Sequence, residues 1–349
     1  MSLTETAFYT RRAINWGILG IIGYILLRIF WSIFLSVFFS IFPPTAPPPN
    51  HAFGKLPALA FPAVATPSAK LTFQLQTISG GVPEASASAT VYFMPKTAPS
   101  LLALNTAQDF ATKLLFNSTP IQESKNIYRF NDPALPLRLL RYDIVSGNFI
   151  VRYNFAQDPS VFTEKNLPDP DTVITTATNL LSSYDLLQDD LANGSQVISY
   201  WKLSGTMLIP VMSLSQADAM RIDFFRAAIG DMKIFTPNPD EAPVDIIYSG
   251  SSNTKKQILE LAYTYWPIDL TTSATYGLIT SAQAWQELQN GQGYIARYPM
   301  NGHSATIRNI YLAYYDSYDP QTYLQPVFVF EGDNGFLAYV PAVATPWVQ

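Results

Sequence analysis

The sequence predicts an α+β fold in which one N-terminal transmembrane helix precedes units built from a helix and an antiparallel sheet. The first observation is an apolar stretch, residues 13–42, that carries a single charge. The second is that segments with helical spacing of apolar residues take turns with segments of apolar–polar alternation. The third is that the order of helix and then strands recurs around residues 106–155, 172–225 and 281–341. Such an order is typical of helices that cover one face of antiparallel sheets.

The apolar stretch is long enough to cross a membrane. At ~1.5 Å per residue, a helix over 13–42 is about 45 Å long, against roughly 30 Å for a hydrocarbon core. Arg11 and Arg12 directly precede it, and the next basic residue after it is Lys55. The positive-inside tendency therefore predicts a cytoplasmic tail over 1–12 and an extracytoplasmic location for the rest. A cleavable signal peptide is the alternative, but its apolar region normally spans only about 7–15 residues.

Arg28 is a candidate contact within the membrane. It lies near the middle of the stretch, where a charge costs at least ~2.5–3.5 kcal/mol. Either the helix slides until Arg28 reaches the inner interface, or Arg28 pairs with an acidic or polar group on another membrane helix. Glu5 is the only acidic residue of the tail, so the chain itself offers no partner within the membrane.

Prolines predict a spacer after the transmembrane helix. Pro43, Pro44 and the run 47–49 favour a stiff, polyproline-like segment, and loose chain continues it. We therefore expect a spacer over 43–69 that holds the folded part off the membrane.

The first extracytoplasmic α+β domain is expected over 70–168. Apolar–polar alternation predicts strands at 71–75 and 89–93. Thr106 is a suitable N-cap for a helix whose apolar stripe runs to Leu114. A hairpin follows, with strands 138–145 and 149–155 joined by Ser146-Gly147-Asn148.

The second extracytoplasmic α+β domain is expected over 169–349. One helix begins after Asp171, and another runs from a capping box at Thr280-x-x-Gln283 to a stop at Gly291. The predicted strands are 197–203, 206–212, 220–225, 244–248, 258–265, 307–315, 323–330 and 336–340.

Composition argues against several classes of function. The formal net charge of −5 gives no electrostatic footprint for nucleic acid. The absence of cysteine excludes disulfides, thiol nucleophiles and thiolate metal sites. Two histidines, His51 and His303, leave little room for histidine metal sites or a Ser-His-Asp triad. With no phosphate-binding loop or nucleophile elbow either, we predict no catalytic residue, no cofactor and no metal.

Acidic residues occur in pairs, which can serve glycosidase chemistry or bind calcium. Most pairs flank expected helices or turns, where aspartate caps the backbone, and we expect that role for them. The pairs are Asp169/Asp171, Asp189/Asp190, Asp240/Glu241, Asp316/Asp319 and Glu331/Asp333.

A dense run of tyrosines is a candidate binding face. Tyrosine supplies contact area in protein interfaces, but packing within a sheet is the alternative. The residues are Tyr311, Tyr314, Tyr315, Tyr318 and Tyr323.

Three segments near the C-terminus resemble envelope proteins related to YycH and YycI. The segment from Thr280 to Gly291 contains the pattern A-W-x-x-L-x-x-G, and the runs 323–332 and 336–342 are also similar. The resemblance implies one membrane helix, an outer α+β domain with PepSY-like units, and a non-enzymatic role in regulating a membrane sensor kinase through helix contacts.

Three functions fit these features. The first is a bacterial membrane-anchored accessory or regulatory protein that acts by binding other membrane or envelope proteins. The second is a structural subunit of a multi-protein envelope or surface assembly, and an oligomer remains open in either case. The third is an Asp/Glu-based hydrolase of wall polymer or peptide. We expect the first, without enzymatic activity.

Overall fold

The computed structural model describes residues 3–41, 48–63, 71–300 and 303–349. The chain divides into two compact units, Met1–Pro47 and Pro48–Gln349. The first unit contains one helix, α1 (Leu3–Ile41). Within it, Asn15–Leu35 has a mean hydropathy of 2.2, and none of its most apolar window is buried. These 21 residues span about 31 Å as a helix, so α1 is long and apolar enough to cross a membrane or to act as a signal sequence.

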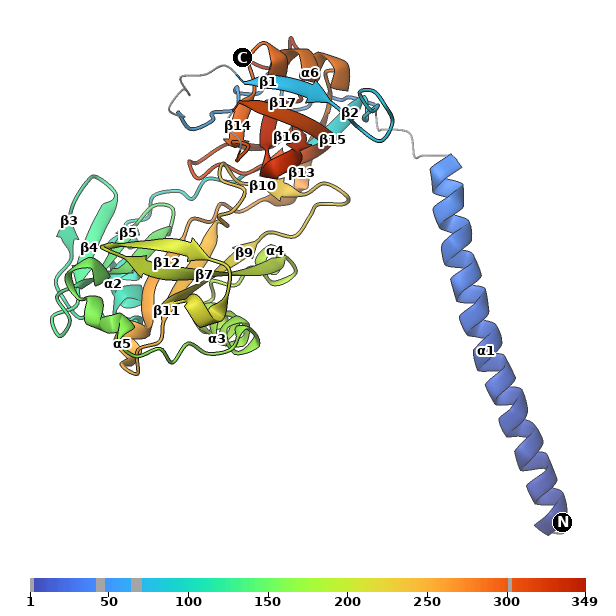
Figure 1. The fold of residues 1–349 in the computed structure, drawn as a ribbon, viewed down its shortest axis with the longest axis horizontal. Helices are drawn as coiled ribbons and strands as arrows, with labels where there is room; N and C mark the ends of the chain where they lie inside the picture. The colour runs from blue at the N-terminus through green and yellow to red at the C-terminus, as the bar shows by residue number, and fades with distance from the viewer. Residues whose placement is uncertain (1–2, 42–47, 64–70, 301–302) are drawn as a thin grey trace. The chain divides into compact units, whose positions relative to one another are not determined.

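The second unit contains two sheets (Figure 1). The nine-stranded sheet is antiparallel throughout, in the order β3-β4-β5-β6-β12-β11-β9-β7-β8. Its strands are β3 (Ile121–Gln122), β4 (Ile127–Asn131), β5 (Arg138–Asp143), β6 (Phe149–Tyr153), β7 (Ser195–Ser204), β8 (Met207–Val211), β9 (Ala219–Phe225), β11 (Val244–Ser249) and β12 (Ile258–Tyr263).

Two helices cover one face of this sheet, α2 (Ala103–Lys113) and α3 (Pro170–Ser183). Their apolar stripes meet alternate strand residues in a single buried core. The residues between those, such as Arg152, Arg221 and Glu260, therefore belong to the opposite face. The short helices are α4 (Asp189–Ala192), α5 (Thr254–Gln257), η1 (Phe155–Gln157), η2 (Pro159–Phe162), η3 (Leu214–Gln216) and η4 (Asp333–Gly335).

The eight-stranded sheet follows the order β1-β15-β16-β17-β14, with β2, β10 and β13 joined to it as branches. Strands β1 and β10 pair with β15 in parallel, and the other pairs are antiparallel. Helix α6 (Ser281–Gln289) packs Ala284 and Leu288 against this sheet. Its strands are β1 (Thr72–Leu75), β2 (Ser88–Phe93), β10 (Ile234–Phe235), β13 (Asp269–Gly277), β14 (Tyr294–Arg297), β15 (Ser304–Tyr315), β16 (Tyr323–Gly332) and β17 (Leu337–Pro341).

The predicted α+β class is confirmed, and so are the units of a helix followed by antiparallel strands. Helix α2 precedes β3–β6, α3 precedes β7–β9, and α6 precedes β14–β17. The capping box of α6 forms as predicted, since the Thr280 side chain accepts from Gln283 N and the Gln283 side chain accepts from Thr280 N. The predicted start of α2 is wrong. The helix begins after Leu102, and Thr106 lies inside it with its hydroxyl donating to the Leu102 carbonyl.

The expected boundary after residue 168 falls within the nine-stranded sheet, because β6 pairs with β12 across it. The described part of the expected spacer, residues 48–63, belongs to the folded unit. Leu56 is fully buried there, and its N–H donates to the Trp347 carbonyl at 2.8 Å. Apolar residues placed between the prolines thus fasten this segment to the C-terminal end of the chain.

Candidate functional site

One segment links the two sheets. After β9 the chain leaves the nine-stranded sheet, pairs with β15 as β10, and returns as β11. We call residues 226–243 the strap. Three tyrosine hydroxyls, from β14, β17 and the loop after β15, hold the strap by donating to its backbone carbonyls. Tyr339 donates to Thr236 at 3.2 Å, Tyr294 to Pro237 at 3.2 Å, and Tyr318 to Glu241 at 3.3 Å.

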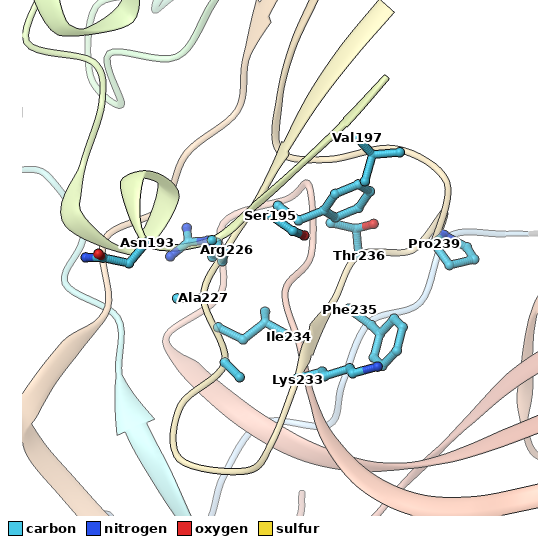
Figure 2. A pocket seen from close by; sticks show the side chains of 13 residues that line it. Asn193, Ser195, Val197, Arg226, Ala227, Lys233, Ile234, Phe235, Thr236 and Pro239 are labelled. Atoms are coloured by element: carbon cyan, nitrogen blue, oxygen red, sulfur yellow. The ribbon is translucent and has the colours of Figure 1, made fainter. Parts of the chain in front are cut away.

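A cavity of about 520 Å³ lies between the strap and the adjacent ends of β7 and β9 (Figure 2). Its size is that of small-ligand pockets, which measure roughly 300–1,000 Å³ and are lined mainly by apolar groups. Apolar lining comes from Val197 and Phe225 on the sheet side, and from Ile234, Phe235 and Pro239 on the strap side.

Gly194 shapes the sheet side of the cavity. A Cβ atom there would lie 1.8 Å from the Phe225 carbonyl oxygen. Only glycine therefore lets the chain enter β7 so close to the end of β9, where Ser195 pairs with Phe225.

Lys233 and Arg226 are the two cationic residues of the lining, and they differ in environment. The Arg226 guanidinium is buried in ion pairs with Asp190 and Asp316, each at 2.9 Å, and lies over the Tyr265 ring at 4.3 Å. Lys233 is exposed and makes no ion pair with any described residue. Lys233 is thus the charge that a ligand would meet.

The Arg226 group carries an excess of negative charge. Burial raises the pKa of Asp316, and Arg226 opposes that rise. Burial also acts to lower the pKa of Arg226, but Asp316 and Asp190 outweigh it and leave the pKa raised. Arg226 therefore stays charged, and its role is to tie α4 and the strap to the end of β15.

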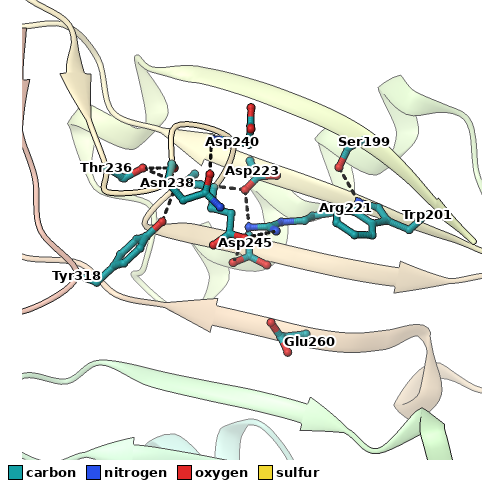
Figure 3. Close-up of polar contacts among 12 residues, drawn as sticks. Ser199, Trp201, Arg221, Asp223, Thr236, Asn238, Asp240, Asp245, Glu260 and Tyr318 are labelled. Atoms are coloured by element: carbon teal, nitrogen blue, oxygen red, sulfur yellow. Dashed lines mark hydrogen bonds and ion pairs between the residues drawn. The ribbon is translucent and has the colours of Figure 1, made fainter. Parts of the chain in front are cut away.

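A second charged group lies beneath the strap, on the face of the nine-stranded sheet opposite to α2 and α3 (Figure 3). Arg221 pairs with Asp223 at 2.9 Å, with Asp245 at 3.4 Å and with Glu241 at 3.8 Å. Asp223 also accepts from Ala242 N at 3.0 Å, which fastens the strap's return. Burial raises the pKa of Asp245 to about 7, with Arg221 acting against the rise and Asp223 adding to it.

The structure does not bring the predicted site residues together. Tyr314 and Tyr315 are buried, and their hydroxyls donate to the Thr90 and Ala60 carbonyls. Both edges of β15 are paired at these positions. Their burial favours packing within the sheet, the alternative left open by the sequence. Tyr311 and Tyr323 are half-buried, and Tyr318 holds the strap.

Arg28 lies in α1, in the other unit, and makes no ion pair with a described residue. Several of the acidic residues act as caps or ion-pair partners. Asp169 caps α3, Asp240 pairs with Arg297, and Asp333 pairs with Arg308. Among the described residues, no group of three or more His, Cys, Asp or Glu could hold a metal ion.

The sequence did not reveal the cavity or the strap. Arg226 and Lys233 lie far from Asp316 in the chain, and the three residues form no local motif. His51, expected in the spacer, is stacked on Trp347 at 3.8 Å between ring centroids. His303 is exposed.

No protein-family model matches this chain, and neither does any curated protein. A solved structure of an uncharacterized protein from Eubacterium rectale ATCC 33656 is similar to this chain. The similar region covers 74% of this chain and 85% of that protein. The identity is 12% and the TM-score is 0.42. At these values the likeness carries no argument about function.

Proposed function

We propose that this chain is a single-pass membrane protein of the cell envelope that acts through contacts with other proteins, without catalysis of its own. Helix α1 is retained as an anchor, with its N-terminus inside and the folded unit on the extracytoplasmic face. Arg11 and Arg12 support this orientation because they precede the apolar span.

The observation that carries the proposal is the state of Arg28. It lies close to the centre of the Asn15–Leu35 span, and the side chains around it are exposed. An unpaired arginine at that depth costs at least ~2.5–3.5 kcal/mol, and an acidic side chain on a neighbouring helix offsets this cost. A second copy of this chain is a poor partner, since a parallel pair would bring two arginines to the same depth.

A regulatory role is also what the resemblance to YycH- and YycI-type proteins implies. In such a role, the extracytoplasmic unit would pass a signal to the membrane helix of a partner protein. A sensor kinase is one such partner.

The test is co-purification from membranes in mild detergent, with bound proteins identified by mass spectrometry. Arg28→Leu should reduce recovery of a membrane partner at least about fivefold, whereas Arg28→Lys, which keeps the charge, should retain most of it. Equal recovery with all three proteins would refute the proposed contact.

The absence of cysteine allows a clean test of orientation. Single cysteines introduced by Ser2→Cys and Ser252→Cys can be labelled with a membrane-impermeant maleimide in intact cells. Ser252 is exposed in the folded unit. Only Ser252→Cys should react, and labelling of Ser2→Cys alone would reverse the topology.

A further inference from the structure

The strap presents an unpaired strand edge to the cavity. The Lys233 carbonyl accepts from Tyr314 N and the Phe235 carbonyl accepts from Asp316 N, both at 2.8 Å. These two residues therefore direct their backbone groups at β15. Neighbouring residues of a strand direct their backbone N–H and C=O groups to opposite edges. The backbone groups of Ile234 and Thr236 therefore point away from β15.

That second edge has no strand partner. Among the described strands, β10 pairs only with β15. The N–H and C=O of Ile234 and the N–H of Thr236 form no hydrogen bond with another described residue. Both residues are nonetheless buried, with 9% and 4% of their surface exposed. Buried backbone groups are nearly always paired, so this edge lacks the partner that such groups normally have.

The same residues line the cavity. Lys233, Ile234, Phe235 and Thr236 form a continuous stretch of its wall. Across from them lie apolar side chains, including Val197, of which 47% is exposed. Lys233, exposed and without an ion pair, lies at one end of the free edge. The cavity therefore combines three backbone groups in strand geometry, an apolar wall and one positive charge.

An extended peptide satisfies all three features. It forms main-chain hydrogen bonds with an unpaired strand edge, and its alternate side chains enter adjacent pockets. A compact ligand would use the apolar wall but leave the strand edge unsatisfied. A negatively charged residue of the peptide would be attracted to Lys233, which no carboxylate of the described chain neutralises.

We propose that the cavity binds a short extended segment of a partner polypeptide, which pairs with the free edge of β10, places an apolar side chain against Val197 and Phe225, and places an acidic residue beside Lys233. This inference rests on the proposed function, because the ligand is part of a protein partner. It adds a second contact, in the folded unit, to the one at Arg28.

Selection from a random octapeptide display library tests the proposal, with the full chain held in detergent as the target. The Ala228→Trp variant serves as the counter-target. Ala228 lines the cavity and is exposed, so an indole there fills the cavity without disturbing the core. Peptides enriched on the wild-type chain should alternate apolar residues and carry Asp or Glu at one fixed position. No enrichment over the Ala228→Trp variant would overturn the proposal.

Two measurements on the best synthetic peptide distinguish strand pairing from nonspecific binding. Fluorescence anisotropy gives its affinity, and N-methylation of alternate peptide nitrogens removes the donors needed for pairing. Two such peptides can be made, one methylated at the odd-numbered and one at the even-numbered nitrogens. One of the two should bind at least about tenfold more weakly than the unmodified peptide. Equal affinity of both methylated peptides would overturn strand pairing.

A charge swap tests the contact between Lys233 and the acidic residue of the peptide. Lys233→Glu should weaken the acidic peptide at least about fivefold, and replacing the peptide's acidic residue with lysine should restore binding to that variant. Lys113→Glu, at an exposed lysine of α2, is the matched control and should change nothing. If Lys233→Glu behaves like Lys113→Glu, Lys233 does not contact the acidic residue of the peptide.

These results are independent of the Arg28 test, because no membrane partner takes part in the peptide assay. Failure of peptide binding with intact Arg28-dependent co-purification would remove this site alone. Peptide binding without Arg28-dependent co-purification would remove the membrane contact alone.

Discussion

Replacement of Asp245 by asparagine tests the electrostatics beneath the strap. The residue is buried, with 6% of its surface exposed, and its Oδ2 has no hydrogen-bond partner among the described residues. Its pKa in the folded protein is raised from the ordinary value of 3.8 to about 7, mainly by burial. Between these two values the folded protein holds a proton that the unfolded chain releases.

The sign follows from proton linkage. A carboxyl group with a raised pKa in the folded state contributes stability that is complete below pH ~4 and is lost as the pH rises through 7. One pKa unit corresponds to about 1.36 kcal/mol, so the two units between pH 5 and pH 7 correspond to roughly 3 kcal/mol. The Asp245→Asn variant does not titrate there. Its stability relative to the wild type should therefore increase by roughly 3 kcal/mol from pH 5 to pH 8.

The assay is urea denaturation of the full chain in detergent, followed by tryptophan fluorescence at both pH values. Comparing two proteins at each pH cancels the titration of shared groups that do not interact with Asp245. Asp231→Asn removes a charge from an exposed position of the same strap and should show no such increase. If the difference between Asp245→Asn and wild type is the same at pH 5 and pH 8, the reasoning about burial is refuted.

Three further predictions concern stability and use the same assay. Gly194→Ala places a methyl group 1.8 Å from the Phe225 carbonyl oxygen and should cost at least ~1–3 kcal/mol; Gly81→Ala, with nothing within 4 Å, should stay near wild type, and equal effects would contradict the close approach. Thr280→Ala removes the cap of α6 and should cost ~1 kcal/mol, whereas Thr280→Ser should restore it; a neutral Thr280→Ala would show that the cap is dispensable. Tyr339→Phe leaves the buried Thr236 carbonyl without its hydroxyl donor and should cost ~1–3 kcal/mol; an unchanged urea midpoint would mean that this bond does not hold the strap.

Local patterns in the sequence predicted most of the helices and strands. Strand alternation at 220–225 and 244–248 and the capping box at Thr280 depend on neighbouring residues alone, and each appears in the structure. Strand β10, with two residues, is too short to show a period. Strand β13 contains Thr271, Thr272 and Ser273 in place of apolar residues, which hides its alternation.

The candidate site could not be predicted for a different reason. It depends on which distant residues the fold brings together, such as Arg226 with Asp316 and Lys233 with Val197. The tyrosines show the same limit. Their density was visible in the sequence, but the roles of Tyr294, Tyr318 and Tyr339 as donors to strap carbonyls appear only once the strap is placed. The parallel pairing of β1 and β10 with β15 joins segments too far apart in the chain for any local signal.

Photo-crosslinking from α1 in living cells tests the central claim most directly. Tyr24 lies one turn before Arg28 on the same face of the helix, and Leu26 lies on the opposite face; their exposures are similar, at 64% and 61%. A photoreactive amino acid replacing Tyr24 should yield an adduct with another membrane protein that is lost with Arg28→Leu, while one replacing Leu26 should not. Adducts from neither position, or equal adducts from both that persist with Arg28→Leu, would contradict an Arg28-directed contact.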